Sequence, residues 1–154
     1  MSYQSVITLV ERAFVSHIGN QSWLASNGLN VDDSFGHPSA SWPWIFVSCK
    51  STAEQPEQSG NFMASVELLI VGRLDPDNAS TYADNVNDHR DRVGLLHNYI
   101  TDTLTPGGLE GALSGYSNSL KVYDIRLAGS EREINTAEGT LEDVFNLEVY
   151  CKEV

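Results

Sequence analysis

The sequence predicts an α+β fold: a single two-layer domain over residues 1–154, with two helices packed against an antiparallel or mixed sheet of four or more strands. Two segments repeat apolar residues at the helical spacing and four are strand-like, in the order helix, loop, strand, strand, helix, strand, strand. Domains usually contain about 100–150 residues, so a chain of 154 residues is expected to form one domain. With 41% hydrophobic and 19% charged residues, the chain needs neither a disulfide nor a metal to hold a core.

Residues 2–18 form the first predicted helix. Its apolar stripe comprises Tyr3, Val6, Ile7, Val10, Ala13, Phe14 and His17, whereas Gln4, Glu11, Arg12 and Ser16 fall outside the stripe. Ser2 is the candidate N-cap, and Gly19 is a natural stop. Residues 20–41 are polar and rich in turn formers, so we expect a long ordered loop there with at most one short strand.

The next two predicted strands form one extended hairpin. Residues 43–50 contain the run WIFVSC, whose near-continuous apolar character is typical of a strand covered on both faces. Residues 62–74 alternate with a period of two over an unusually long strand. Residues 51–61 between them are polar, with a proline and a glycine, and predict a projecting loop.

The second predicted helix covers residues 81–104. The turn formed by residues 75–78 precedes it, and Thr81 with Asp84 resembles a capping box. Its apolar face carries Val86, His89, Val93, Leu96, Ile100 and Leu104, and its polar face carries Asp84, Asp88, Asp91, Asn98 and Asp102. Residues 105–108 end the helix, and a loop rich in Gly and Ser continues to residue 119.

Two further strands are predicted over residues 120–127 and 141–152, joined by an acidic, polar loop. Cys49 and Cys151 lie in strand-like runs and are interpreted as reduced core residues, although a disulfide between adjacent strands stays open. The first ten residues lack the basic region of a secretory signal.

The charge balance argues against two kinds of partner. Nine Lys and Arg face 21 Asp and Glu, giving a net charge of −12. A field of this sign repels phosphate backbones and anionic membranes, so we expect no tight nucleic-acid binding. No apolar run approaches the ~20 residues of a membrane-spanning helix, and no membrane partner is expected.

The sequence contains no recognisable catalytic, cofactor or metal motif. Asp75 and Asp77 with Asn78 resemble the start of a calcium loop but lack its glycine and distal glutamate, so strand exit and helix start explain them better. His89, His97 and His17 are interpreted as packed, rim or interface residues, and the stripe of Asp84, Asp88 and Asp91 as a solvated helix face. The aromatic residues Trp42, Trp44, Tyr116, Tyr123 and Tyr150 are either core residues or contact anchors.

Five segments together resemble the tail terminator (tail completion) proteins of long-tailed bacteriophages and, more loosely, their neck and minor tail relatives. These segments are VITLVERAFVSHI, WPWIFVSCKS, MASVELLIVGR, HRDRVGLLHNYITDTL and EDVFNLEVYCKE, and the resemblance extends from about Val6 to Glu153. It lies in the order of elements and the types of residue, with a long strand that ends in Arg73, an Asp-rich turn and then a helix.

The resemblance implies a structural phage or prophage protein that is not an enzyme and has no cofactor. Such proteins form a ring, commonly hexameric, at the head-proximal end of the tail tube, where the ring ends tube polymerisation and joins the tail to the head. The implied partners are further copies of the chain, the tail tube protein and a head–tail connector or neck protein, while DNA passes through without tight binding. The implied locations are the head–tail junction of the virion and, during assembly, the host cytoplasm.

Two other classes of function stay open. A small ligand- or partner-binding α+β module without catalytic activity predicts a monomer or dimer with one concave apolar pocket. An enzyme with an unrecognised site predicts clustered titratable groups with shifted pKa values. For a ring, we expect an acidic or neutral channel, and the sequence does not choose which acidic group lines it. One group is Asp75, Asp77, Asp84, Asp88 and Asp91, and the other is Glu131, Glu133 and Glu138.

Overall fold

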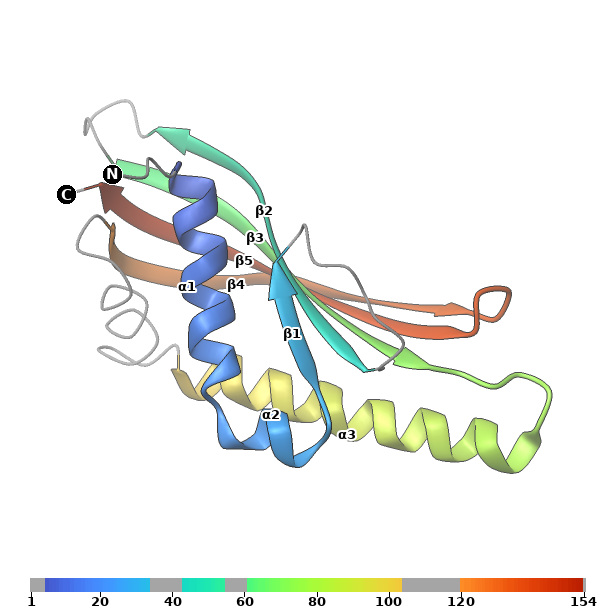
Figure 1. The fold of residues 1–154 in the computed structure, drawn as a ribbon. Coiled ribbons are helices and arrows are strands. Elements are labelled where there is room, and N and C mark those ends of the chain that lie inside the picture. Colours follow the sequence, from blue (N-terminus) through green and yellow to red (C-terminus); the bar gives the residue numbers. More distant parts are fainter. Residues whose placement is uncertain (1–4, 34–42, 55–60, 104–119, 154) are drawn as a thin grey trace.

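A mixed five-stranded sheet with helices packed against it confirms the predicted α+β class (Figure 1). The computed structural model describes residues 5–33, 43–54, 61–103 and 120–153. The helices are α1 (Val6–Gly19), α2 (Ser22–Ser26) and α3 (Ala79–Thr103), and the strands are β1 (Asn30–Asp33), β2 (Trp44–Glu54), β3 (Asn61–Arg73), β4 (Leu120–Asn135) and β5 (Thr140–Glu153). The strand order is β1-β2-β3-β5-β4, and β1 pairs with β2 in parallel while the other pairs are antiparallel.

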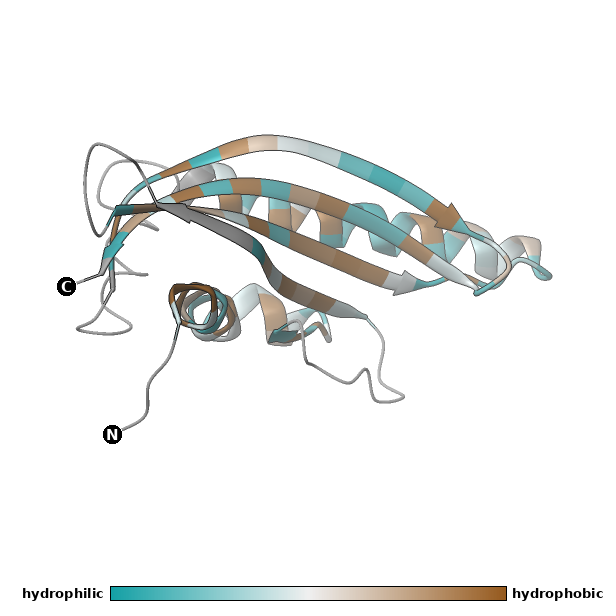
Figure 2. Cartoon of the chain, turned by 90° about the horizontal axis from the view of Figure 1, so that it is seen from above, coloured by the Kyte–Doolittle hydropathy of each residue, from teal (hydrophilic) through white to brown (hydrophobic). Residues whose placement is uncertain are grey.

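The core lies between the helices and one face of the sheet. Val66 and Leu68 of β3 are buried, as are Leu147 and Phe145, which pair with them on β5. The residues between them in each strand are only half-buried. Figure 2 shows the corresponding hydrophobic and hydrophilic bands along the strands. Phe14 of α1 and Leu96 of α3 belong to the same buried cluster, so both helices cover this one face. The result is the two-layer arrangement that the sequence predicts.

The caps of both long helices differ from the prediction. Ser5, not Ser2, caps α1, because its side chain accepts a hydrogen bond from the backbone N–H of Thr8 at 3.3 Å. Asn78, not Thr81, caps α3, since its Oδ1 accepts from the backbone N–H groups of Ser80 and Thr81. Asparagine is among the strongest N-caps, and for this reason the helix begins directly after Asn78 and not at the predicted residue 81.

Glu11 is the largest departure from the predicted stripe of the first helix. It is only 4% exposed, although the periodicity places it outside the apolar face. Its Oε1 accepts a hydrogen bond from the backbone N–H of Cys49 at 2.9 Å, next to the register shift between Cys49 and Ser51 in β2. A bulge disturbs the hydrogen bonds of the ladder, and this carboxylate satisfies a backbone donor there.

Two predicted loops are in part strand. Residues 51–54 continue β2 and pair with β3, while residues 55–60 lie outside the described residues. Residues 128–135 continue β4, which leaves a turn of only residues 136–139 before β5. Charged residues occupy both faces of this part of β4, so the hydrophobic alternation that reveals a half-buried strand is missing. Within residues 20–33, the structure has the expected short strand, β1, and an unpredicted short helix, α2.

Gly139 in the β4–β5 turn is a position where substitution should be costly. Its φ is +68°, and a Cβ there would lie 2.9 Å from the carbonyl oxygen of Leu74, whose N–H donates to the Gly139 carbonyl. Gly139→Ala should therefore add left-handed strain of about 1–2 kcal/mol and also push against a backbone atom. Gly28→Ala is the matched control, because Gly28 has φ +64° but no atom within 4 Å of its Cβ position. Thermal melts should show a larger loss for Gly139→Ala, and equal losses would contradict the close contact.

Candidate functional site

Three charged or titratable side chains meet where α3 crosses β5 and β4. We call them the His89–Asp143–Arg132 cluster. The His89 Nε2 lies 2.8 Å from the Asp143 Oδ1, and the Arg132 Nε lies 3.1 and 3.0 Å from the two oxygens of Asp143. His89 and Asp143 are only 3% and 7% exposed, whereas the Arg132 side chain is 52% exposed. The carboxylate therefore connects a buried imidazole to a guanidinium at the surface.

The register of the sheet brings these residues together. Asp143 pairs with Ile70 on one side and Arg132 on the other, in the row of β5 that faces the helices. His89 lies four residues before Val93 on the buried face of α3. Gly72 of β3 leaves space for the imidazole, because a Cβ at Gly72 would lie 3.0 Å from the His89 Nδ1.

The surroundings of His89 favour its neutral form. Burial is the largest influence and lowers the pKa of His89, and the contacts with Asp143 only oppose this effect. The His89 Nδ1 is buried without a hydrogen-bond partner among the described residues. A neutral imidazole with its hydrogen on Nε2 donates to Asp143 and leaves no buried N–H unsatisfied.

The pKa direction gives a pH prediction. Since the folded state binds protons more weakly than the unfolded state, the free energy of unfolding should be at its plateau above about pH 7 and fall as the pH drops below the unfolded histidine value of about 6.5. Burial also lowers the pKa of His17, which contributes in the same direction. Urea midpoints measured between about pH 5.5 and 7.5 should show this slope, and His89→Gln should flatten it in part. His97→Gln, a change at an exposed histidine, is the control. A His89→Gln slope equal to that of the wild type would contradict the assignment.

A groove adjoins the cluster between α3 and the edge strand β4, with β5 as its floor. We call it the α3–β4 groove. It consists of a hollow of about 460 Å³ and a smaller one of about 50 Å³. Its lining includes Arg90, Val93 and His97 of α3, Ser130 and Arg132 of β4, and Phe145 of β5. Val93 and Phe145 make part of the groove apolar, and its charged lining consists of two arginines, Arg90 and Arg132, and two acids, Glu131 and Asp143.

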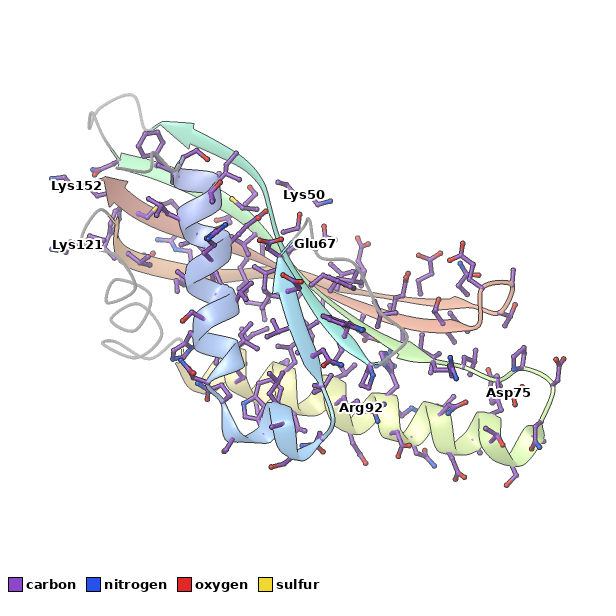
Figure 3. The ribbon with its side chains drawn as sticks, viewed as in Figure 1. Lys50, Glu67, Asp75, Arg92, Lys121 and Lys152 are labelled. Atoms are coloured by element: carbon purple, nitrogen blue, oxygen red, sulfur yellow. The ribbon has the colours of Figure 1, made fainter. Side chains whose placement is uncertain are left out.

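The structure brings Asp75, where one candidate acidic group begins, to the same end of the molecule as the β4–β5 turn of the other group, whereas Asp91 lies at the middle of the 25-residue helix α3. Asp75 lies at this end in Figure 3, at the exit of β3, beside the turn that joins β4 to β5. Glu133 pairs directly with Glu142 across β4 and β5. Burial, followed by the charges of Glu133 and Glu138, raises the pKa of Glu142. Lys121 and Lys152 pair with each other at the opposite end of the sheet.

A second, partly buried group joins α1 to the far end of α3. The His17 Nδ1 and the Tyr99 hydroxyl are hydrogen-bonded, and the Trp23 ring lies 5.8 Å from the Tyr99 ring. Burial raises the pKa of Tyr99 and lowers that of His17. His17 is therefore a packing residue between helices, as the sequence predicts.

The other sequence candidates have local roles. Asp75 accepts a hydrogen bond from the backbone N–H of Asp77, which makes it a turn residue. Trp44 stacks on Phe46 at 5.6 Å on the face of the sheet that the helices leave open, and the Tyr123 and Tyr150 rings lie 6.3 Å apart. Trp42 and Tyr116 lie outside the described residues.

Cys49 and Cys151 are buried free thiols on β2 and β5, with β3 between them, so they are not on adjacent strands.

Two further features, a metal site and a membrane-spanning helix, were searched for in the described residues. Within them, no group of three or more His, Cys, Asp or Glu side chains could hold a metal ion. None of the helices in this part of the chain combines the length and the apolar character that crossing a membrane requires.

The sequence interpretation missed Asp143 and Arg132. A signal for Asp143 exists, because it interrupts the apolar row of Leu141, Phe145 and Leu147 at an inward-facing position.

No serine, threonine or cysteine of the described residues hydrogen-bonds either nitrogen of His89, and both oxygens of Asp143 are occupied. This geometry suits a clamp that ties α3 to the β4–β5 hairpin.

The chain matches no protein-family model, and no curated protein matches it.

Proposed function

We propose that this chain is a tail terminator of a phage or prophage. Copies of it form a ring at the head-proximal end of the tail tube, and the resemblance implies six copies in each ring. The ring ends tube polymerisation and joins the tail to the head. The observation that carries the proposal is the succession of elements. The five segments that resemble the family contain most of α1, β3, α3 and β5 and the start of β2 of one two-layer domain. The proposed partners are other copies, the tail tube protein and a connector or neck protein.

The charge distribution supports a conduit for DNA. The acidic segments around Asp75 and Glu133 come together at one end of the molecule. Repeated around a ring, that end would repel a DNA duplex, which favours sliding over binding. The proposed location is the head–tail junction of the virion, reached from the host cytoplasm where assembly takes place.

The His89–Asp143–Arg132 cluster has a structural role in this proposal. A ring subunit must keep α3 fixed on the sheet while neighbouring subunits and the tube press on it. A carboxylate that joins side chains from α3 and β4 to β5 supplies this rigidity through charge-assisted hydrogen bonds. We therefore assign no reaction to the cluster.

Negative-stain microscopy of the purified chain, alone and mixed with tail tubes, tests the proposed function. The expected result is a ring that sits on one end of each tube and stops its elongation. Gel-shift assays at physiological salt should detect no duplex DNA binding. Salt-sensitive micromolar binding would instead favour a DNA-contacting neck role. Tubes that grow equally long with and without the chain would contradict termination.

A small ligand- or partner-binding module is the second candidate, and the groove is the observation that favours it. A hollow of about 460 Å³ lies within the range of small-molecule sites, about 300–1,000 Å³. This function predicts a stable monomer or dimer that ignores tail tubes and melts at a higher temperature when its ligand is bound.

A further inference from the structure

The N-terminal half of α3, residues 79–92, is attached to the sheet by very little buried surface. The structure describes all of these residues, and His89 is the only one of them that is buried. A hydrogen bond from the Asp75 backbone N–H to the Asn85 Oδ1, 2.9 Å long, adds a polar attachment at the exit of β3. In the second half of the helix the buried residues are Val93, Leu96, Tyr99 and Ile100. The first half therefore relies on one titratable side chain where the second half relies on an apolar stripe.

The part of the sheet that this half of α3 covers is equally poor in buried residues. We call residues 128–143 the β4–β5 ribbon. Residues 130–134 are all exposed, and the buried residues of the ribbon are Leu141 and Asp143. A hollow of about 50 Å³ is lined by Val86 of α3 and by Ile134 and Leu141 of the ribbon. Segments with few buried apolar contacts open at a lower free energy than the core, so this half of α3 should open separately.

The imidazole of His89 has charged neighbours on three elements and close backbone on a fourth. Among the described residues, the charged groups around it are Asp143 of β5, Arg132 of β4, and Arg90 and Arg92 of α3 itself. On the β3 side lies Gly72, where a Cβ would be 3.0 Å from the His89 Nδ1. This Nδ1 is buried and has no hydrogen-bond partner, whereas the Nε2 is engaged with Asp143.

A proton added to His89 has to bind the Nδ1, because the hydrogen on Nε2 is already donated to Asp143. The new N–H would be buried without an acceptor, and its charge would be repelled by the neighbouring arginines and attracted by Asp143. Burial is the larger influence, and it lowers the pKa of His89 in the folded chain. In an open form the imidazole is hydrated and has its ordinary pKa of about 6.5. The open form therefore binds protons more tightly, and acid favours opening.

We infer that His89 is a pH-sensitive switch: its protonation releases the N-terminal half of α3 from the β4–β5 ribbon while the core of the domain stays folded. Arg90 lies on the released half, so opening also removes part of one wall of the α3–β4 groove. A molecule held in that groove would lose this contact at acidic pH. The inference does not depend on the proposed function, since it applies to a single chain.

Hydrogen exchange of the full chain, followed by mass spectrometry, measures the opening of each segment. After correction for the intrinsic exchange rate, the opening equilibrium constant of residues 79–92 should rise by up to about tenfold between about pH 7.5 and 5.5. This is the limit for one group whose pKa is about 6.5 in the open form. Residues 64–70 at the centre of β3 should have a larger opening free energy throughout, because their exchange requires global unfolding.

Two histidine variants identify the group responsible. His89→Gln keeps a side-chain N–H for Asp143 but does not titrate in this range, so the opening of residues 79–92 should lose its pH dependence. His97→Gln, at an exposed histidine of the same helix, is the matched control and should keep it. An NMR titration of the wild type needs no substitution: the His89 ring signal should respond at a lower pH in the folded chain than in the urea-unfolded chain.

Three results would overturn the switch. The first is an opening constant of residues 79–92 that does not change with pH, or that keeps its pH dependence in His89→Gln. The second is an equal opening free energy in residues 79–92 and 64–70, because this half of α3 would then leave the sheet only on global unfolding. The third, which decides the matter if His89→Gln does not fold, is a His89 signal that responds at the same pH in the folded chain as in the unfolded chain, or at a higher one.

Discussion

Replacement of Leu96 with aspartate is expected to leave the protein unfolded. Leu96 is 0% exposed and lies in the buried cluster beneath α3. An unpaired carboxylate there loses its hydration without gaining a partner, which costs several kcal/mol in addition to the lost apolar burial. A domain of this size has a total stability of about 5–15 kcal/mol, so this single change consumes a large share of it.

Far-UV circular dichroism and urea titration measure the effect. Asn98→Asp is the matched control, since it introduces the same carboxylate on the exposed side of the same helix. The control should melt within a few degrees of the wild type, whereas Leu96→Asp should lose its cooperative transition. A folded Leu96→Asp variant with an unchanged midpoint would show that α3 does not pack on the sheet as described.

Asp143→Ala is expected to have the second largest effect, a loss of about 1–3 kcal/mol. The change removes the acceptor of both His89 and Arg132 and leaves the buried His89 Nε2 without a partner. Arg132→Ala should cost less, because its side chain is half-exposed and water replaces part of the lost contact.

A double-mutant cycle identifies which partner of Asp143 matters. Asp143→Ala combined with His89→Leu should be less destabilised than the sum of the single changes, because both ends of the buried hydrogen bond are then absent. Additive losses would mean that the imidazole and the carboxylate act independently. The free energy of unfolding from urea titrations supplies all four corners of the cycle.

The strongest sequence patterns predict elements correctly because burial on one face constrains many residues at once. The alternation through Ala64, Val66 and Leu68 predicts β3 to within a residue at each end, and the helical repeat of Val93, Leu96 and Ile100 predicts α3 almost as closely. The second half of β4 has no such constraint. Both of its faces are exposed there, so charged residues occur on both faces. The hydrophobic alternation that predicts a strand is therefore absent.

The cluster and the groove depend on tertiary structure. His89 and Asp143 are 54 residues apart, and nothing local to either predicts the pairing. The groove requires β4 to occupy the edge of the sheet and α3 to stop short of it, and strand order is not encoded in the pattern of any one strand. The terminator function stays a prediction, since its support is a resemblance and a charge distribution.

The two buried thiols on strands either side of β3 have a practical consequence for measuring how the sheet opens. Cys49 is 6% exposed and Cys151 is 0% exposed, so an alkylating reagent reaches either sulfur only when the surrounding structure separates. When closing is faster than alkylation, the labelling rate at each site reports the free energy of that opening. The bulge and β1 lie on the Cys49 side, and β1 pairs with β2 only from Trp44 to Val47, whereas Cys151 is paired with both β3 and β4. Single-thiol variants would therefore show whether the β1–β2 side separates before the rest of the domain unfolds.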